Sequence, residues 1–296
     1  FPLLLQAREI TLAKPVVLLI EPAEQHTGDF RAVKPALGED GHEQAGMGIA
    51  IGDYLHTGRP SLVVTNFALD NTPLYRNDGK WDFQDVSYPS GIGLPSVPYV
   101  KWGVAFVDLD NDGWPDIFFV TGSVYPEVEK HLPAYPYRTP RVIFRNLGNG
   151  RFEELIEEGG PGVAAAHASR GCAFGDFDND GDLDILIVNL NEPPSLLRND
   201  LGGRNHWLKV KLIGTKSNRS AIGARVTCRY GDRRQVQEVL SQSSFYSVND
   251  PRLHFGLGAV ETANLEVRWP SGAVETYAKV AADRIVVIKE GEGIVS

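Results

Sequence analysis

Short runs of apolar residues, separated by turns rich in aspartate, asparagine and glycine, repeat three times between residues 48 and 199. Each copy opens with a glycine that an aspartate follows five positions later, then has an apolar run, then a run that ends in Arg-Asn. The opening segments are residues 48–53, 103–108 and 171–176; the second runs are 62–64, 117–120 and 185–188; the third are 74–77, 143–146 and 196–199. Because the runs are apolar at consecutive positions, both faces of each strand should be covered. Repeats of this kind predict β-propeller blades.

The number of blades is the open point of this pattern. A turn and a fourth strand follow in the first two copies, at residues 81–84 and 151–154, but the third copy has no obvious fourth strand. Three blades are also fewer than the four or more that close a propeller. We expect a partial propeller whose upstream blades belong to a longer chain. The alternative is that residues 15–20 supply strands whose register the pattern does not fix.

A second all-β region follows the repeats. Seven strand-like runs, separated by Gly, Asn, Asp and Ser turns, predict a β-sandwich or a small barrel. They are residues 206–213, 223–230, 235–240, 252–255, 264–269, 274–278 and 284–289. We expect Trp207, Trp269 and Phe255 to fill its core, the alternative being a carbohydrate-binding platform. The predicted organisation is an N-terminal segment of uncertain structure (1–40), three blades (41–203) and a sandwich-like domain (204–296).

Two of the turns carry carboxylates at positions 1, 3, 5 and 9 around a glycine at position 6. Calcium binds six to eight oxygens, and alternate residues of a tightly curled loop can direct carboxylates inward where glycine makes the turn. Positions 7 and 9 would add a backbone carbonyl and a bidentate carboxylate. The predicted ligands of the two sites are Asp108, Asp110, Asp112, Trp114 and Asp116, and Asp176, Asp178, Asp180, Asp182 and Asp184. These loops are not EF-hands, because strands flank them and no glutamate stands at position 12.

Electrostatics supports the calcium interpretation over that of a merely polar turn. Two unit charges about 4 Å apart repel by roughly 4 kcal/mol at an effective dielectric constant near 20, so four clustered carboxylates need a cation. The corresponding loop of the first repeat keeps Asp53 but has Leu55, Thr57 and Ser61 at positions 3, 5 and 9. We expect that loop to bind no ion.

Charge and cysteine content exclude several classes of protein. The formal net charge is -9, and two calcium ions would bring it to about -5 (-9 + 4). No basic stripe is present, which argues against nucleic-acid binding, and the Arg-Asn pairs are interpreted as structural turn residues. Two cysteines, Cys172 and Cys228, do not make a disulfide framework.

Residues 1–20 are interrupted by charges and proline, so they predict no transmembrane segment, and a leader could precede Phe1.

No arrangement of catalytic residues emerges outside the acidic loops. The seven histidines are scattered without a metal-ligand spacing or a nucleophile elbow. The glycine pairs at 46–48 and 256–258 lack the full spacing of a phosphate loop. Carboxylates that hold a cation are poor acids and bases for glycoside hydrolysis. We therefore predict that the chain is not an enzyme.

The repeats resemble FG-GAP/VCBS repeats, the calcium-loop blades also found in integrin α-chain heads. The last hundred residues resemble the ASPIC/UnbV domain, through residues 205–212, 217–225, 254–258 and 267–272. Together they resemble the C-terminal half of a cartilage acidic protein-like chain over roughly residues 40 to 291. The resemblance implies a secreted or cell-surface calcium-binding protein without catalysis.

From these observations we expect an adhesion module that binds a protein or glycan partner at the blade rims. The alternatives are a calcium-dependent carbohydrate-active enzyme, or its non-catalytic portion, and a purely structural assembly element. The sequence does not identify the ligand.

Overall fold

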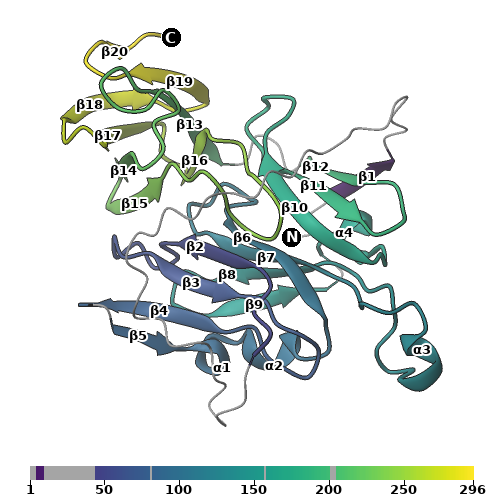
Figure 1. The fold of residues 1–296 in the computed structure, drawn as a ribbon. Helices are drawn as coiled ribbons and strands as arrows, with labels where there is room; N and C mark the ends of the chain where they lie inside the picture. The colour runs from purple at the N-terminus through teal and green to yellow at the C-terminus, as the bar shows by residue number, and fades with distance from the viewer. Residues whose placement is uncertain (1–4, 10–43, 81, 157, 201–204) are drawn as a thin grey trace.

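The computed structural model describes residues 5–9, 44–80, 82–156, 158–200 and 205–296, and in these ranges the fold is all-β with five four-stranded sheets (Figure 1). Three sheets are the blades and two form the C-terminal domain. The predicted fold class, propeller-type blades followed by a sandwich-like domain, is confirmed. Most of the predicted N-terminal segment lies outside the described residues. None of the described helices is long and apolar enough to cross a membrane.

Each blade is an antiparallel sheet, and in the first two blades neighbouring strands follow one another along the chain. The strands of the first blade are β2 (Ile49–Gly52), β3 (Ser61–Val64), β4 (Leu74–Gly79) and β5 (Asp82–Asp85). Those of the second are β6 (Lys101–Val107), β7 (Asp116–Thr121), β8 (Val142–Asn146) and β9 (Phe152–Leu155). The third contains β10 (Ser169–Gly175), β11 (Asp184–Asn189) and β12 (Ser195–Asn199).

The fourth strand of the third blade comes from the other end of the described chain. Strand β1 (Leu5–Glu9) pairs antiparallel with β12, from Leu5 opposite Asn199 to Glu9 opposite Ser195. Residues 15–20, the alternative source of strands, lie outside the described residues. The sequence pattern missed β1 because a five-residue strand with only two apolar positions is too short for periodicity to detect.

Consecutive apolar residues of the second blade face two different neighbours. All six residues of β7 are buried, and they alternate between two cores. Ile117 and Phe119 pack into the core shared with the first blade, whereas Phe118 and Val120 pack into the core shared with the third. Burial on both faces explains why the strand is apolar throughout.

The Asn of each Arg-Asn pair fastens its blade, as we expected of structural turn residues. The backbone N–H groups of Asn77, Asn146 and Asn199 donate to the side chains at position 9 of their loops, which are Ser61, Asp116 and Asp184. The Asn146 amide also donates to the carbonyls of Pro115 and Tyr54, both at 3.0 Å. The bond to Tyr54 joins the second blade to the first.

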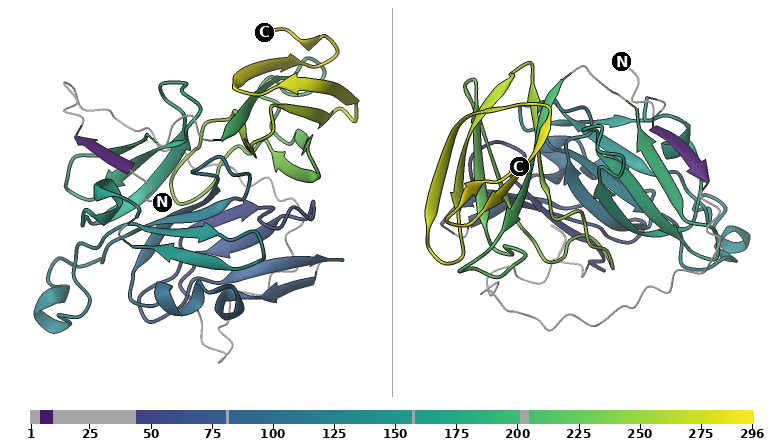
Figure 2. Two further views of the ribbon diagram at one scale, coloured as in Figure 1. Left: turned by 180° about the vertical axis from the view of Figure 1, so that it is seen from behind. Right: turned by 90° about the horizontal axis from the view of Figure 1, so that it is seen from above.

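The ends of the blades away from the acidic loops carry four short helices. They are α1 (Ser87–Ser90), α2 (Gly93–Ser96), α3 (Val128–His131) and α4 (Pro161–Ala164). The fully buried Lys101 secures this end, because its ammonium donates to the carbonyls of Phe67, Asp70 and Ser96. Figure 2 shows these helices and the C-terminal domain at opposite ends of the blades.

The C-terminal domain is a sandwich of two sheets. One contains β16 (Leu253–Gly258), β13 (His206–Ile213), β19 (Arg284–Lys289) and β20 (Gly293–Ile294), and the other β15 (Arg233–Glu238), β14 (Arg225–Tyr230), β17 (Thr262–Arg268) and β18 (Val274–Ala281). Strands β13 and β19 are parallel. Phe255 and Trp269 lie in the core, as predicted. Trp207 is half-buried and stacks on His254 instead.

The segment 240–252, which we call the strap, connects β15 to β16 and crosses the centre of the blades. Ser244 donates its N–H to the carbonyl of Ile49 in β2 (3.1 Å), and its hydroxyl accepts from Val104 in β6 (2.9 Å). Asn249 accepts from the N–H of Phe174 in β10 at 3.2 Å. Since β2, β6 and β10 are the first strands of the three blades, the strap contacts every blade at its inner strand.

Replacing Asn146 with Ala should destabilise the fold more than replacing its counterpart Asn77. Asn146→Ala leaves two carbonyls unpaired in a buried region, and we expect it to lower the free energy of unfolding by about 2 to 4 kcal/mol. Asn77 donates to one carbonyl, that of Pro60, so Asn77→Ala should cost about 1 kcal/mol. Urea denaturation measures both values. Equal losses would show that the bond between the blades contributes nothing.

Candidate metal centres

The first acidic loop connects β6 to β7 and curls around the carboxylate of Asp108. One oxygen of Asp108, Oδ2, accepts from the N–H of Gly113 at 2.9 Å. Gly113 has a φ of 90°, in the left-handed region that glycine adopts without strain. Asp112 accepts from the N–H of Trp114 at 2.7 Å. These side-chain bonds to the backbone hold the loop in a tight turn.

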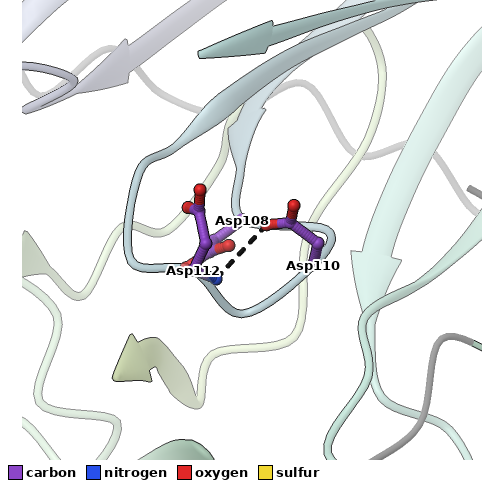
Figure 3. A group of neighbouring side chains, drawn as sticks. All are labelled: Asp108, Asp110 and Asp112. Carbon is purple, nitrogen blue, oxygen red and sulfur yellow. Dashed lines mark hydrogen bonds between the residues drawn. The ribbon is translucent and has the colours of Figure 1, made fainter. Parts of the chain in front are cut away.

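The turn gathers three of the predicted ligands of this loop. Asp108, Asp110 and Asp112 each offer an oxygen within 4.8 Å of the others (Figure 3). Asp116 is buried beside them but is not part of that group. Its Oδ1 accepts from Asn146 N–H (2.8 Å) and its Oδ2 faces Leu109 N–H (3.4 Å). Asp116 therefore holds the backbone of the blade as well as being a predicted ligand.

The electrostatics of the first loop fits a cation. Burial, and then the charges of Asp112, Asp110 and Asp116, raise the pKa of Asp108 well above its usual range. Burial and the charge of Asp110 raise the pKa of Asp112 to about 6. The second oxygen of Asp108, Oδ1, is buried and has no hydrogen-bond partner. A buried carboxylate oxygen without a hydrogen-bond donor is expected where the oxygen serves as a metal ligand.

The second acidic loop, between β10 and β11, repeats this geometry with different neighbours. Asp176 accepts from the N–H groups of Asp180 and Gly181, both at 3.1 Å. Asp176, Asp178 and Asp184 each offer an oxygen within 4.8 Å of the others. Burial raises the pKa of Asp184 to about 7. This loop therefore also gathers carboxylates that need a counter-charge.

The remaining predicted ligands lie outside both groups. The side chain of Asp182 accepts from the amide of Asn111 at 3.0 Å, and Trp114 stacks on His56 with ring centroids 4.2 Å apart. Asp180 accepts from the N–H of Asp182 at 2.9 Å. Trp114 and Asp182 remain predicted ligands through their backbone carbonyls.

The corresponding loop of the first blade satisfies its aspartate without an ion. One oxygen of Asp53 accepts from the N–H and hydroxyl of Thr57 at 2.9 and 3.3 Å, and the other accepts from Gly58 N–H at 2.6 Å. Among the described residues, no further carboxylate joins Asp53 in a group that could hold a metal. That this loop binds no ion stays a prediction, which the hydrogen bonds of Asp53 support.

The C-terminal domain rests on all three loops, a contact that sequence reasoning did not find. Its cationic side chains donate to loop carbonyls: Arg234 to Thr57, Arg225 to Gly58, Arg233 to Asp112 and Arg252 to Asp176. Asn111 of the first acidic loop links the second acidic loop to the C-terminal domain. Its amide donates to Gly181 O (3.1 Å) in the second loop, and its oxygen lies 2.6 Å from His254 Nε2 in the C-terminal domain. The partners are about 70 to 180 positions apart in sequence, beyond any local pattern.

A cavity of about 200 Å³ lies between the blades, the strap and the C-terminal domain. Asp108 is among its lining residues, together with Gly52, Phe106, Leu253 and His254. Asp108 therefore belongs both to the acidic loop and to the wall of this cavity.

Comparison with known proteins identifies both regions. The family described as FG-GAP-like repeat matches residues 53–119 and 136–187, and the family ASPIC and UnbV matches residues 214–295. Cartilage acidic protein 1 from Homo sapiens is 30% identical over 256 residues, which are 83% of this chain and 36% of that protein. The proteins of the same name from Mus musculus and Xenopus tropicalis are 30% identical over 84% of this chain and 37% of their own length. The chain thus spans just over a third of the length of these relatives.

Calcium should stabilise the fold more at about pH 7.5 than at about pH 5. Because the folded-state pKa values of Asp112 and Asp184 are raised, the ion-free fold holds protons that the unfolded chain has lost, and it loses stability as pH rises from about 4 to 7. Calcium must displace these protons at pH 5 but not at pH 7.5. At each pH, the melting temperature in calcium minus that in chelator gives the stabilisation by calcium. Histidine titration affects both samples equally at a given pH, so it cancels in this difference. Equal stabilisation at the two pH values would contradict the assignment.

Proposed function

The chain belongs to the proteins that join FG-GAP-like repeats to an ASPIC/UnbV domain, the family to which cartilage acidic protein 1 is related, and from this membership we propose that it is a calcium-binding recognition module without catalysis. The observation that carries the proposal is the unpartnered Oδ1 of Asp108, which is buried within a group of three carboxylates.

The chain's own residues prepare two calcium sites. In the first, Asp108, Asp110 and Asp112 each bring an oxygen within 4.8 Å of the others; in the second, Asp176, Asp178 and Asp184 do so. Calcium supplies a double positive charge that reverses the repulsion among these carboxylates. At an affinity of about 10⁻⁴ M, typical of extracellular modules, about 1 mM calcium would stabilise the fold by roughly 1.4 kcal/mol per site.

Calcium titration tests the two sites. Isothermal titration of chelator-treated protein should give about two ions per chain. Asp110→Asn and Asp178→Asn should each remove one ion, because they lower the charge of one loop and keep an oxygen that can accept a hydrogen bond. These positions are preferable to Asp116 and Asp184, whose carboxylates also hold the backbone of Asn146 and Asn199.

The matched control is Asp53→Asn, in the loop whose aspartate is already satisfied by Thr57 and Gly58. Its calcium stoichiometry should equal that of the unsubstituted protein. If folded, unsubstituted protein binds no calcium, the proposal is wrong.

The absence of catalysis is supported by the roles of four of the five described histidines. His167 pairs with Glu192 at 2.6 Å, and His206 pairs with Asp283 at 2.7 Å. His56 bonds the carbonyl of Gly113, and His254 bonds Asn111. Each of these imidazoles ties one segment of the fold to another, and none lies beside a serine, threonine or cysteine nucleophile in these contacts.

A panel of polysaccharides, glycosides and esters tests this part of the proposal. Calcium-loaded protein should release no product from any of them. Turnover that is lost on replacing one histidine or one carboxylate outside the loops, with calcium stoichiometry unchanged, would favour a carbohydrate-active enzyme.

The rim away from the calcium loops supports the partner-binding role. The loop rim is occupied by the C-terminal domain, whereas the other rim exposes apolar side chains on the connections between strands. They are Leu69, Tyr88, Leu94, Tyr125 and Leu132, of which Leu69 and Leu94 are 71% and 72% exposed. Exposed apolar side chains that gather on one end of a fold are typical of a binding surface for a protein or glycan.

Further blades of a longer protein are the proposed cover for the outer faces of the first and third blades. Ile49 and Ile51 are 51% and 40% exposed on the first blade, and Leu186 and Val188 are 45% and 47% exposed on the third. Blades normally cover one another on these faces. The name of the relatives refers to cartilage, a tissue that consists largely of extracellular matrix, and we propose an extracellular or cell-surface location for this chain.

A further inference from the structure

The two acidic loops have matching aspartates but meet different side chains of the C-terminal domain. At the first loop the domain presents Gly256, where an added Cβ would lie 2.0 Å from Asp108 Oδ2. At the second loop it presents Lys209, whose ammonium donates to Asp176 Oδ2 at 2.7 Å. Asp108 and Asp176 are both the position-1 aspartates of their loops. Asp108 is therefore faced by a neutral backbone and Asp176 by a cation. Arg233 of the same domain also reaches the first loop, but it donates to the carbonyl of Asp112 and not to a carboxylate.

The contact between Lys209 and Asp176 is fully enclosed. Both side chains are 0% exposed. Lys209 lies in β13, opposite His254 in β16, so the ammonium comes from the sandwich and not from the blades. In the described part of the chain, no lysine or arginine forms an ion pair with Asp108, and its Oδ1 has no partner.

A second cation of the C-terminal domain supports the same loop without binding its carboxylates. Arg252 donates to the carbonyl of Asp176 at 2.9 Å and to Asn179 Oδ1 at 2.6 Å. Its charge is matched by Asp250 at 2.6 Å. Of these two cations of the C-terminal domain, Lys209 is therefore the one that pairs with a carboxylate of the second loop.

We propose that Lys209 is a built-in counter-charge of the second acidic loop, which makes its calcium site weaker than the first and keeps the loop docked on the C-terminal domain when calcium is absent. The inference rests on the proposed calcium sites. A fixed positive charge near a bound dication repels it, and within a buried site this repulsion is only partly screened. The Lys209 ammonium also partners Asp176 before the ion arrives, so calcium gains less there by neutralising the loop.

Lys209 is a positioning residue in this account, because it contacts the oxygen of Asp176 that also accepts from Gly181. The other oxygen of Asp176 accepts from Asp180, and is the one left to face an ion. The ammonium thus sets the charge and orientation of the carboxylate without standing in the place of the metal.

Calcium titration of Lys209→Met tests the inference. Unsubstituted protein should show two unequal sites, and Lys209→Met should tighten the weaker one by about tenfold. The same substitution in a protein carrying Asp110→Asn isolates the second loop and identifies the site that changes. In chelator, Lys209→Met should melt at a lower temperature than the unsubstituted protein, and calcium should recover most of the loss.

Lys211→Met is the matched control, because Lys211 lies two positions along the same strand and is exposed. It should change neither calcium affinity. Lys209→Gln keeps an N–H donor without the charge and replaces the Met variant if that variant does not fold. It should also tighten the second site.

Two results separate the failure of this inference from that of the proposed function. Unsubstituted protein that binds two ions, with the affinity of the second loop unchanged or weakened in both Lys209 variants, overturns the counter-charge alone. Folded unsubstituted protein that binds no calcium overturns the proposed function, and the counter-charge with it.

Discussion

The structure depends on neutralising the negative charge of two loops that folding buries. Asp108, Asp116, Asp176 and Asp184 are each at most 6% exposed, yet all four are carboxylates. Buried carboxylates need donors or cations, since an isolated charge in a protein interior is strongly unfavourable. Backbone N–H groups, loop glycines in left-handed conformations and side chains of another domain all converge on these loops. The calcium proposal follows from what these partners leave unsatisfied, above all the second oxygen of Asp108.

The same constraint explains why the blades and the C-terminal domain form one joined body. Arginines of the sandwich donate to the carbonyls of all three loops, and Asn111 links the two acidic loops to His254. The strap adds hydrogen bonds to the inner strand of each blade. Both acidic loops therefore contribute directly to the contact between the domains. The blade ends that carry the short helices lie away from this joint, and they are where we propose that a partner binds.

Sequence patterns predicted what is local and missed what is distant. The three blades, the acidic loops and most strands of the sandwich could be located, because spacing around Gly113 and Gly181 and runs such as 117–120 are read within a few residues. Strand β1, the strap and the role of Lys209 could not be located, because each depends on contacts with residues far away in the sequence. Nothing next to Lys209 in His-Trp-Leu-Lys-Val distinguishes a counter-charge from a lysine facing solvent; only the fold brings it to Asp176.

The most direct test of the account is anomalous X-ray diffraction from crystals grown with calcium. We predict one anomalous-difference peak among Asp108, Asp110 and Asp112, a second among Asp176, Asp178 and Asp184, and none beside Asp53. The second peak should lie on the side of Asp176 away from Lys209. A well-ordered structure in calcium with no peak at either acidic loop, or with a peak at Asp53, would contradict the assignment of these loops as the calcium sites on which the fold depends.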